Sequence, residues 1–174
     1  MTNFSLFEEK HNLNFTDKNL LKQAFIHRSY INENSGIATS HNERLEFLGD
    51  AVLELVTTEE LYKRFRDKPE GELTAIRAAM VNTVSISEAA TALGMNEFLL
   101  LSKGESKDKG KAREYILANT FEAMTGAIYL DAGYDAAKDF IAKALFGKIE
   151  SIVRMKLWRD SKSLVQEKSQ EILN

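Results

Sequence analysis

Apolar residues recur along most of the chain with the three- to four-residue spacing of helices that bury one face. A single proline and nine glycines leave few helix breakers, and no convincing run alternates between apolar and polar residues as a strand would. The predicted fold class is therefore all-α. The expected helices cover residues 4–11, 17–30, 43–65, 69–93, 115–131 and 135–153.

The helix expected over residues 43–65 has two contrasting faces. At about 100° per residue, Glu43, Glu46 and Asp50 fall within an arc of roughly 60°. Asn42 precedes them as a candidate N-cap. The opposite face carries the stripe expected to enter the core, Leu45, Leu48, Val52, Leu55 and Val56.

An acidic helix face is most often simply solvated, and two details weigh against that interpretation here. Arg44 is the only cation in the first turns, so the acids lack the i, i+4 partners that usually stabilise such a face. Phe47 lies on the polar side beside the acids. An aromatic residue in that position indicates a contact with another surface, most simply a second subunit.

A second helix, expected over residues 115–131, repeats the arrangement. Asn119 and Glu122 stand at i and i+3, and Gly126 follows at i+7. A glycine inside a helix costs about 1 kcal/mol relative to alanine, so Gly49 and Gly126 indicate a close approach of two backbones, although tolerated accidents would look the same. If the helices cross at these glycines, their polar faces converge.

Other candidate sites have simpler explanations. Glu8 and His11 form a lone Glu-x-x-His, whereas a di-iron bundle needs this motif on two helices together with two further glutamates. His27 is expected to be a packed or capping residue near the end of its helix. Residues 102–113, called the basic loop below, carry five cations and two acids; such a loop is usually solvated, but beside an acidic metal site it could hold phosphates.

Length and composition bound the function. A chain of 174 residues is long enough for one domain with a sizeable core. The absence of cysteine excludes disulfides and thiolate metal sites and allows a reducing, cytoplasmic location. The N-terminus does not resemble a signal peptide, and no apolar run is long enough to span a membrane. The net charge of −3 argues against a general nucleic-acid binder unless a metal neutralises the acids.

The candidate ligands are oxygen atoms, which favour Mg²⁺ or Mn²⁺ over Zn²⁺. Such ions bind one or two carboxylates and leave room for phosphate oxygens, so hydrolysis of phosphodiesters is the natural reaction class. A solvated acidic patch remains the simpler alternative.

The acidic stretch His41–Leu53 resembles the signature of the ribonuclease III family almost letter for letter. The resemblance continues through five further stretches and covers essentially residues 1–158, a full catalytic domain. Residues 159–174 contain a segment, 160–167, that resembles the start of a double-stranded-RNA-binding domain, so we expect a linker and the opening of that domain there. The further stretches are 69–73, 77–82, 115–123, 126–131 and 133–134.

The resemblance implies an all-α homodimer that cuts double-stranded RNA with Mg²⁺, for which Mn²⁺ may substitute, in the processing of ribosomal and messenger RNA. Each subunit would leave a 5′-phosphate, a 3′-hydroxyl and a short 3′ overhang. Asp50 and Glu122 match catalytic positions, with Glu46 and Asn119 completing the metal ligands. Glu43 and Glu70 match supporting or substrate-binding acids, and Phe47 matches the dimer contact.

Asn119 is the one clear departure, because the family usually has aspartate there. An amide oxygen can bind Mg²⁺ but brings no charge, so weaker metal binding is expected. The alternative function is therefore a weakened or inactive member that binds structured RNA without cutting it.

Overall fold

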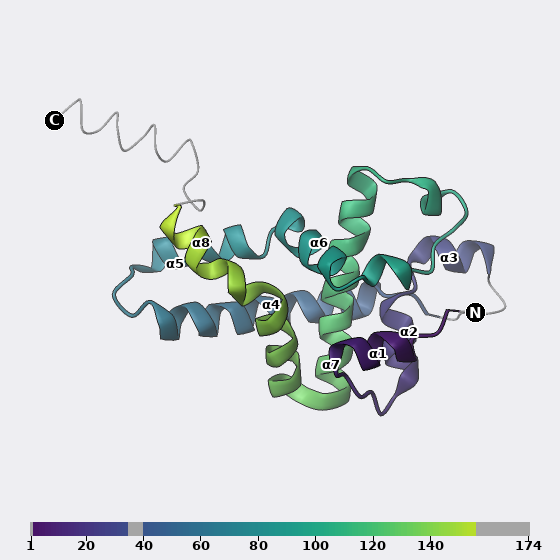
Figure 1. The fold of residues 1–174 in the computed structure, drawn as a ribbon, viewed down its shortest axis with the longest axis horizontal. Coiled ribbons are helices and arrows are strands. Elements are labelled where there is room, and N and C mark those ends of the chain that lie inside the picture. Colours follow the sequence, from purple (N-terminus) through teal and green to yellow (C-terminus); the bar gives the residue numbers. More distant parts are fainter. Residues whose placement is uncertain (1, 35–39, 156–174) are drawn as a thin grey trace.

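The computed structural model describes residues 2–34 and 40–155, and this part of the chain is helical, with one isolated bridge between Ile26 and Leu100 (Figure 1). The all-α prediction is confirmed. The predicted linker and domain start at 159–174 lie outside the described residues. The helices are α1 (Ser5–His11), α2 (Lys18–Ala24), α3 (Arg28–Glu33), α4 (Glu43–Arg64), α5 (Glu70–Met80), α6 (Thr83–Ala92), α7 (Lys111–Leu145) and α8 (Ile149–Arg154), with the short turns η1 (Met95–Glu97), η2 (Glu105–Lys107) and η3 (Phe146–Lys148).

Helix α4 crosses α7 near the middle of the domain, and the other helices pack around this pair (Figure 1). The apolar stripe of α4 enters the core with Leu45, Val52 and Val56, which are buried, and Leu48, which is partly buried. Leu55 was expected in this stripe, but it is 58% exposed. That part of the prediction is wrong, because the helices around α4 cover a narrower arc than the apolar residues do.

Two expected helices are broken in the structure. The segment 17–30 divides into α2 and α3, because Phe25 and Ile26 leave the helix and His27 begins α3. His27 therefore caps the start of a helix, where its Nδ1 accepts from Ser29 N, instead of lying near the end of one. The segment 69–93 divides at Asn82, whose side chain accepts a hydrogen bond from Ser85 N and caps α6.

The helices expected over 115–131 and 135–153 meet at Gly133. Its positive φ of 84° breaks α7 into two halves, and α8 follows after η3. Glu59 of α4 secures the second half, because its carboxylate accepts hydrogen bonds from Tyr134 Oη and Lys138 Nζ, each at 2.8 Å. No helix within the described ranges is both long enough and apolar enough to cross a membrane.

Candidate active site

The backbones of α4 and α7 are in direct contact at two glycines. A Cβ atom at Gly49 would lie 2.6 Å from the carbonyl carbon of Glu122 and 2.8 Å from Gly126 N. A Cβ at Gly126 would in turn lie 3.1 Å from Gly49 N and would clash with the carbonyl oxygen of Leu45. Only residues without a Cβ allow this approach, and the structure confirms that both glycines mark the crossing.

The crossing brings the acids of both helices together. Glu46 and Asp50 flank Gly49 on α4, and Glu122 lies one turn before Gly126 on α7. Burial raises the pKa of Glu122 to about 7, and the negative charges of Asp50 and Glu46 act in the same direction. Burial, followed by the charges of Glu43 and Asp50, also raises the pKa of Glu46. The four carboxylates therefore form one electrostatically coupled group.

This group lacks a compensating cation at its centre. Within residues 2–34 and 40–155, no lysine, arginine or histidine forms an ion pair with Glu46, Asp50 or Glu122. Nor do any three acidic or histidine side chains of these residues gather closely enough to hold a metal ion as they stand. The carboxylates repel one another across the crossing without forming a finished ligand shell, so a cation bound here would have to draw them together.

The remaining predicted residues of this region lie around the coupled group. Asn119 is half-buried one turn before Glu122, so its amide faces the same side of α7. Glu43, at the start of α4, lies 3.9 Å from an Arg28 guanidinium nitrogen and 3.7 Å from His41 Nδ1. Phe47 is 83% exposed beside the acids, as expected for a residue on the polar face.

Glu70 is the one predicted site residue that the structure does not bring to this group. It begins α5, where its carboxylate accepts a hydrogen bond from Thr74 Oγ1 at 3.0 Å. It lines a cavity of about 450 Å³ together with Thr58 and Tyr62 of α4. At 1.5 Å per residue, Thr58 lies roughly 18 Å along the helix from Glu46.

Arg28 was not singled out from the sequence as a neighbour of the acids. It lay within a segment expected to end a helix, and its contact with Glu43 depends on the break that starts α3. The contact of His27 depends on the same break, because its Nδ1 lies 2.8 Å from the hydroxyl oxygen of Ser29 in the first turn of α3. No local signal in the sequence marked this break, because the apolar spacing runs on across it.

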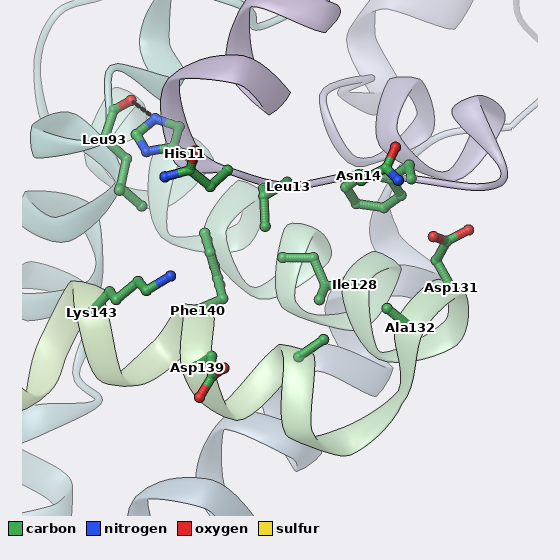
Figure 2. A pocket seen from close by; sticks show the side chains of 13 residues that line it. His11, Leu13, Asn14, Leu93, Ile128, Asp131, Ala132, Asp139, Phe140 and Lys143 are labelled. Carbon is green, nitrogen blue, oxygen red and sulfur yellow. Dashed lines mark hydrogen bonds between the residues drawn. The ribbon is translucent and has the colours of Figure 1, made fainter.

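Glu8 and His11 have structural roles, in agreement with the simpler interpretation of that motif. Glu8 is buried and accepts hydrogen bonds from Phe15 N and Lys18 Nζ. His11 bonds through Nε2 to the carbonyl of Leu93 and lines a cavity of about 200 Å³ at the bend of α7 (Figure 2). None of the predicted catalytic or metal-binding residues lines that cavity.

The crossing of α4 and α7 defines an all-helical domain with an acidic site built around a contact between two glycines. A family model described as Ribonuclease-III-like matches residues 17–149, and the chain belongs to the ribonuclease III family. It is 44% identical over 161 residues to ribonuclease 3 of Treponema denticola, covering 92% of this chain and 65% of that protein. It is 49% identical over 142 residues to ribonuclease 3 of Oceanobacillus iheyensis, covering 82% of this chain and 62% of that one.

Among solved structures, the chain is similar to the nuclease domain of ribonuclease III from Campylobacter jejuni. The TM-score is 0.73 at 40% identity, and the match covers 82% of this chain and 98% of that one. That structure is described for its flexibility in a region involved in dimer formation. The chain thus matches a complete nuclease domain, while it spans a little under two thirds of the length of the curated relatives.

Proposed function

We propose that this chain carries the catalytic domain of an endoribonuclease that uses a divalent metal ion to hydrolyse phosphodiester bonds in double-stranded RNA. The observation that carries the proposal is the position of Glu122 against Glu46 and Asp50, where burial and their charges raise the pKa of Glu122 to about 7. Carboxylates whose pKa values are raised by burial and by one another mark a candidate functional site, and a divalent cation would relieve their mutual repulsion. Membership of the ribonuclease III family supports the same reaction.

The proposed metal is Mg²⁺, for which Mn²⁺ may substitute. The donor set fits, because carboxylate and amide oxygens are the ligands that these ions prefer. The proposed ligands are Glu46, Asp50, Glu122 and the amide oxygen of Asn119. When bound, the ion would activate a water and stabilise the leaving oxygen of the phosphodiester.

The protein residues would divide the remaining work. Without a metal ion, burial and the charges of Asp50 and Glu46 raise the pKa of Glu122 to about 7; a bound cation would stabilise its charged form, so its proposed role is that of a ligand. Glu43 is proposed as a supporting acid, held near Arg28 and His41 at the edge of the site. Glu70 would reach a site only if a second subunit brought it there.

A homodimer is the proposed assembly. Phe47, Leu55 and Tyr62 are 83%, 58% and 73% exposed, and on a helical wheel they lie within about 80° of one another along α4. An exposed apolar stripe of this length is typical of a protein interface. It begins beside the acids, so a partner packed on it would border the site.

The proposed substrate is an RNA duplex, which proteins recognise mainly by its backbone shape and 2′-hydroxyl groups. In the proposed dimer each subunit would cut one strand, leaving a 5′-phosphate, a 3′-hydroxyl and a short 3′ overhang. Processing of ribosomal and messenger RNA is the proposed biological role.

Cleavage of long double-stranded RNA with Mg²⁺ tests the proposal directly. The wild type should give short duplex products, and Glu122→Gln should lose cleavage at least 100-fold if this carboxylate binds the metal or moves a proton. Glu9→Gln is the matched control, because Glu9 is an exposed glutamate of α1 outside the site. Equal cleavage by the wild type and Glu122→Gln would refute the site.

Asn119 favours a second candidate function, namely binding of structured RNA without cleavage. A neutral amide in place of a carboxylate removes one negative charge from the proposed ligand set. If the chain is an active enzyme, Asn119→Asp should lower the Mg²⁺ concentration that gives half-maximal cleavage. Binding of duplex RNA with no product in either Mg²⁺ or Mn²⁺ would support the second function instead.

A further inference from the structure

Glu43 and Glu46 lie in the first turn of α4, which is the part of a helix that is least stable on its own. The first N–H groups of a helix have no partner within the helix, and terminal turns open more readily than the middle. A carboxylate in this turn has a fixed direction only if other parts of the protein hold the turn. The contacts at the start of α4 therefore bear on the acidic group.

Asn42 occupies the position before this turn, as the sequence predicted, but its side chain does not cap the helix. Its amide instead donates through Nδ2 to the carbonyl oxygen of Ala24, at 3.2 Å. The backbone N–H of Asn42 donates to the carbonyl oxygen of Ile26, and its own carbonyl accepts from Glu46 N, each at 2.9 Å. Asn42 is thus bonded on one side to the segment between α2 and α3 and on the other to the first turn of α4.

Burial makes the bond from Asn42 to Ala24 specific for an amide. Asn42 is only 2% exposed. A carbonyl oxygen can only accept a hydrogen bond, so the side chain facing it has to donate. A side chain without an N–H group would leave a buried carbonyl unpaired, which costs more than a hydrogen bond contributes on balance. The capping rule placed Asn42 correctly but did not predict this requirement for a donor.

The segment that Asn42 contacts is also held from another side. Leu100 N donates to the carbonyl oxygen of Phe25 at 2.9 Å, and His27 N donates to the carbonyl oxygen of Leu100 at 3.1 Å. These bonds form the isolated bridge at Ile26, and Leu100 lies just before the basic loop. The start of α4 is therefore joined to a segment that has its own support.

A second side-chain amide joins α2 to the start of α4. Gln23, which is half-buried, donates through Nε2 to the carbonyl oxygen of His41 at 2.9 Å. His41 adjoins Asn42, so the two amide bonds lie next to each other. They can be removed separately, because one donor belongs to α2 and the other to residue 42.

The glycine crossing alone does not set the direction of the acids on α4. It fixes the helix at Gly49, which lies about 10 Å along the axis from Asn42 at 1.5 Å per residue. A helix held tightly at one point can still tilt within its apolar packing. The bonds of Asn42 provide a second fixed point, and Glu46 lies between the two.

We propose that Asn42 is a positioning residue of the acidic site, which fixes the first turn of α4 so that Glu46 is directed at a metal ion shared with Glu122. The inference rests on the proposed function, because it assigns Asn42 a role toward the proposed metal. Asn42 acts through Glu46 and is not itself a ligand, since its amide nitrogen is bonded to Ala24. Residues that orient metal ligands typically contribute about 10- to 100-fold to metal affinity.

The test measures Mn²⁺ binding by calorimetry without RNA, beside unfolding in urea. Asn42→Ala removes the donor to Ala24 and keeps the backbone bonds. The matched control is Asn82→Ala, because Asn82 also begins a helix and donates to a backbone carbonyl, that of Ala79 at 2.9 Å. None of the proposed ligands lies in α6. Asn42→Ala should bind Mn²⁺ at least about 10-fold more weakly than the wild type, whereas Asn82→Ala should lose stability and keep the wild-type affinity.

Gln23→Ala is an independent variant that changes no residue of α4. It removes the bond to the His41 carbonyl, and the half-buried position of Gln23 makes the substitution tolerable even if Asn42→Ala fails to fold. Mn²⁺ binding should weaken in the same direction as in Asn42→Ala. The affinities are compared at a temperature at which the urea curves show all the variants to be folded.

A wild-type Mn²⁺ affinity in folded Asn42→Ala would overturn the inference; if that variant does not fold, the same result in Gln23→Ala would do so. An equal loss of affinity in Asn82→Ala would also overturn it, because general destabilisation would then explain the effect. The outcomes separate the two proposals. If the wild type binds Mn²⁺, Asn42→Ala binds it weakly and no RNA is cut, the proposed enzyme is refuted and the role of Asn42 stands. If the wild type cuts RNA and Asn42→Ala binds Mn²⁺ normally, only the role of Asn42 is refuted. A wild type that binds no Mn²⁺ refutes both the metal site and this role.

Discussion

Replacing Gly49 by alanine would add a methyl group where the backbones of α4 and α7 are in contact. The new Cβ would lie 2.6 Å from the carbonyl carbon of Glu122 and nearer still to its oxygen. Ordinary contact begins at 3.4 Å, so the carbon alone would have to move by about 0.8 Å. Both obstacles belong to helix backbone, so whole turns have to separate, and no side chain can rotate away to relieve the clash.

The size of the effect follows from two opposing terms. In an unhindered helix, glycine to alanine stabilises by about 1 kcal/mol. Overpacking a tight contact typically costs about 1–3 kcal/mol, and a rigid obstacle favours the upper end. The net expectation for Gly49→Ala is a loss of about 2 kcal/mol, or a melting temperature lower by roughly 4–8 °C for a chain of this size.

Urea unfolding followed by circular dichroism measures this loss, and Gly71→Ala provides the matched control. Gly71 lies in the first turn of α5, and a Cβ there would meet nothing within 4 Å. Its replacement should be neutral or stabilise by up to about 1 kcal/mol. If Gly49→Ala proved as stable as Gly71→Ala, the crossing would not depend on the missing side chain, and the reasoning would be wrong.

Three further outcomes are expected. Because burial, Asp50 and Glu46 raise the pKa of Glu122 from 4.5 to about 7, the folded state holds a proton that the unfolded state has released between these values. Without divalent metal, the melting temperature should fall as pH rises through this window, and Glu122→Gln should reduce the fall. An equal fall of the melting temperature with pH in both proteins would contradict this. Asn82→Ala removes the cap of α6 and should cost about 1 kcal/mol in urea unfolding; an unchanged midpoint would show that the cap is dispensable. Phe47→Asp should shift sedimentation towards the monomer, because a charge cannot be buried in the proposed contact without a partner; an unchanged sedimentation coefficient would exclude Phe47 from the interface.

Helical periodicity predicted the position and approximate ends of α4 because that helix pairs a continuous apolar stripe with a polar face. The same periodicity concealed the breaks after Ala24 and Met80. At both breaks the apolar spacing continues while the chain changes direction. The next helices begin where the side chains of His27 and Asn82 accept hydrogen bonds from the backbone N–H groups of Ser29 and Ser85. A spacing rule cannot distinguish a helix that continues from one that restarts.

The sequence predicted the site better than it predicted the helix breaks, because two glycines inside helices marked the crossing. Once the crossing was inferred, the approach of Glu46, Asp50 and Glu122 followed from their positions on the helices. The contact between Glu43 and Arg28 could not be inferred in this way, because Arg28 comes from another helix. The position of Glu70 relative to the acids likewise depends on how α5, or a second subunit, packs against α4.

The coupled carboxylates do not hold the crossing together, because like charges in a partly buried group repel. The attraction comes from the apolar residues behind them, where Leu45 and Val52 of α4 share one buried cluster with Phe121 and Met124 of α7. Each such side chain contributes about 1.5–3 kcal/mol on burial, enough to offset the electrostatic cost. The ligands and the contact that positions them are therefore separate features of the sequence, so that a chain with every acid in place but a side chain at residue 49 would have the residues of the site without its geometry.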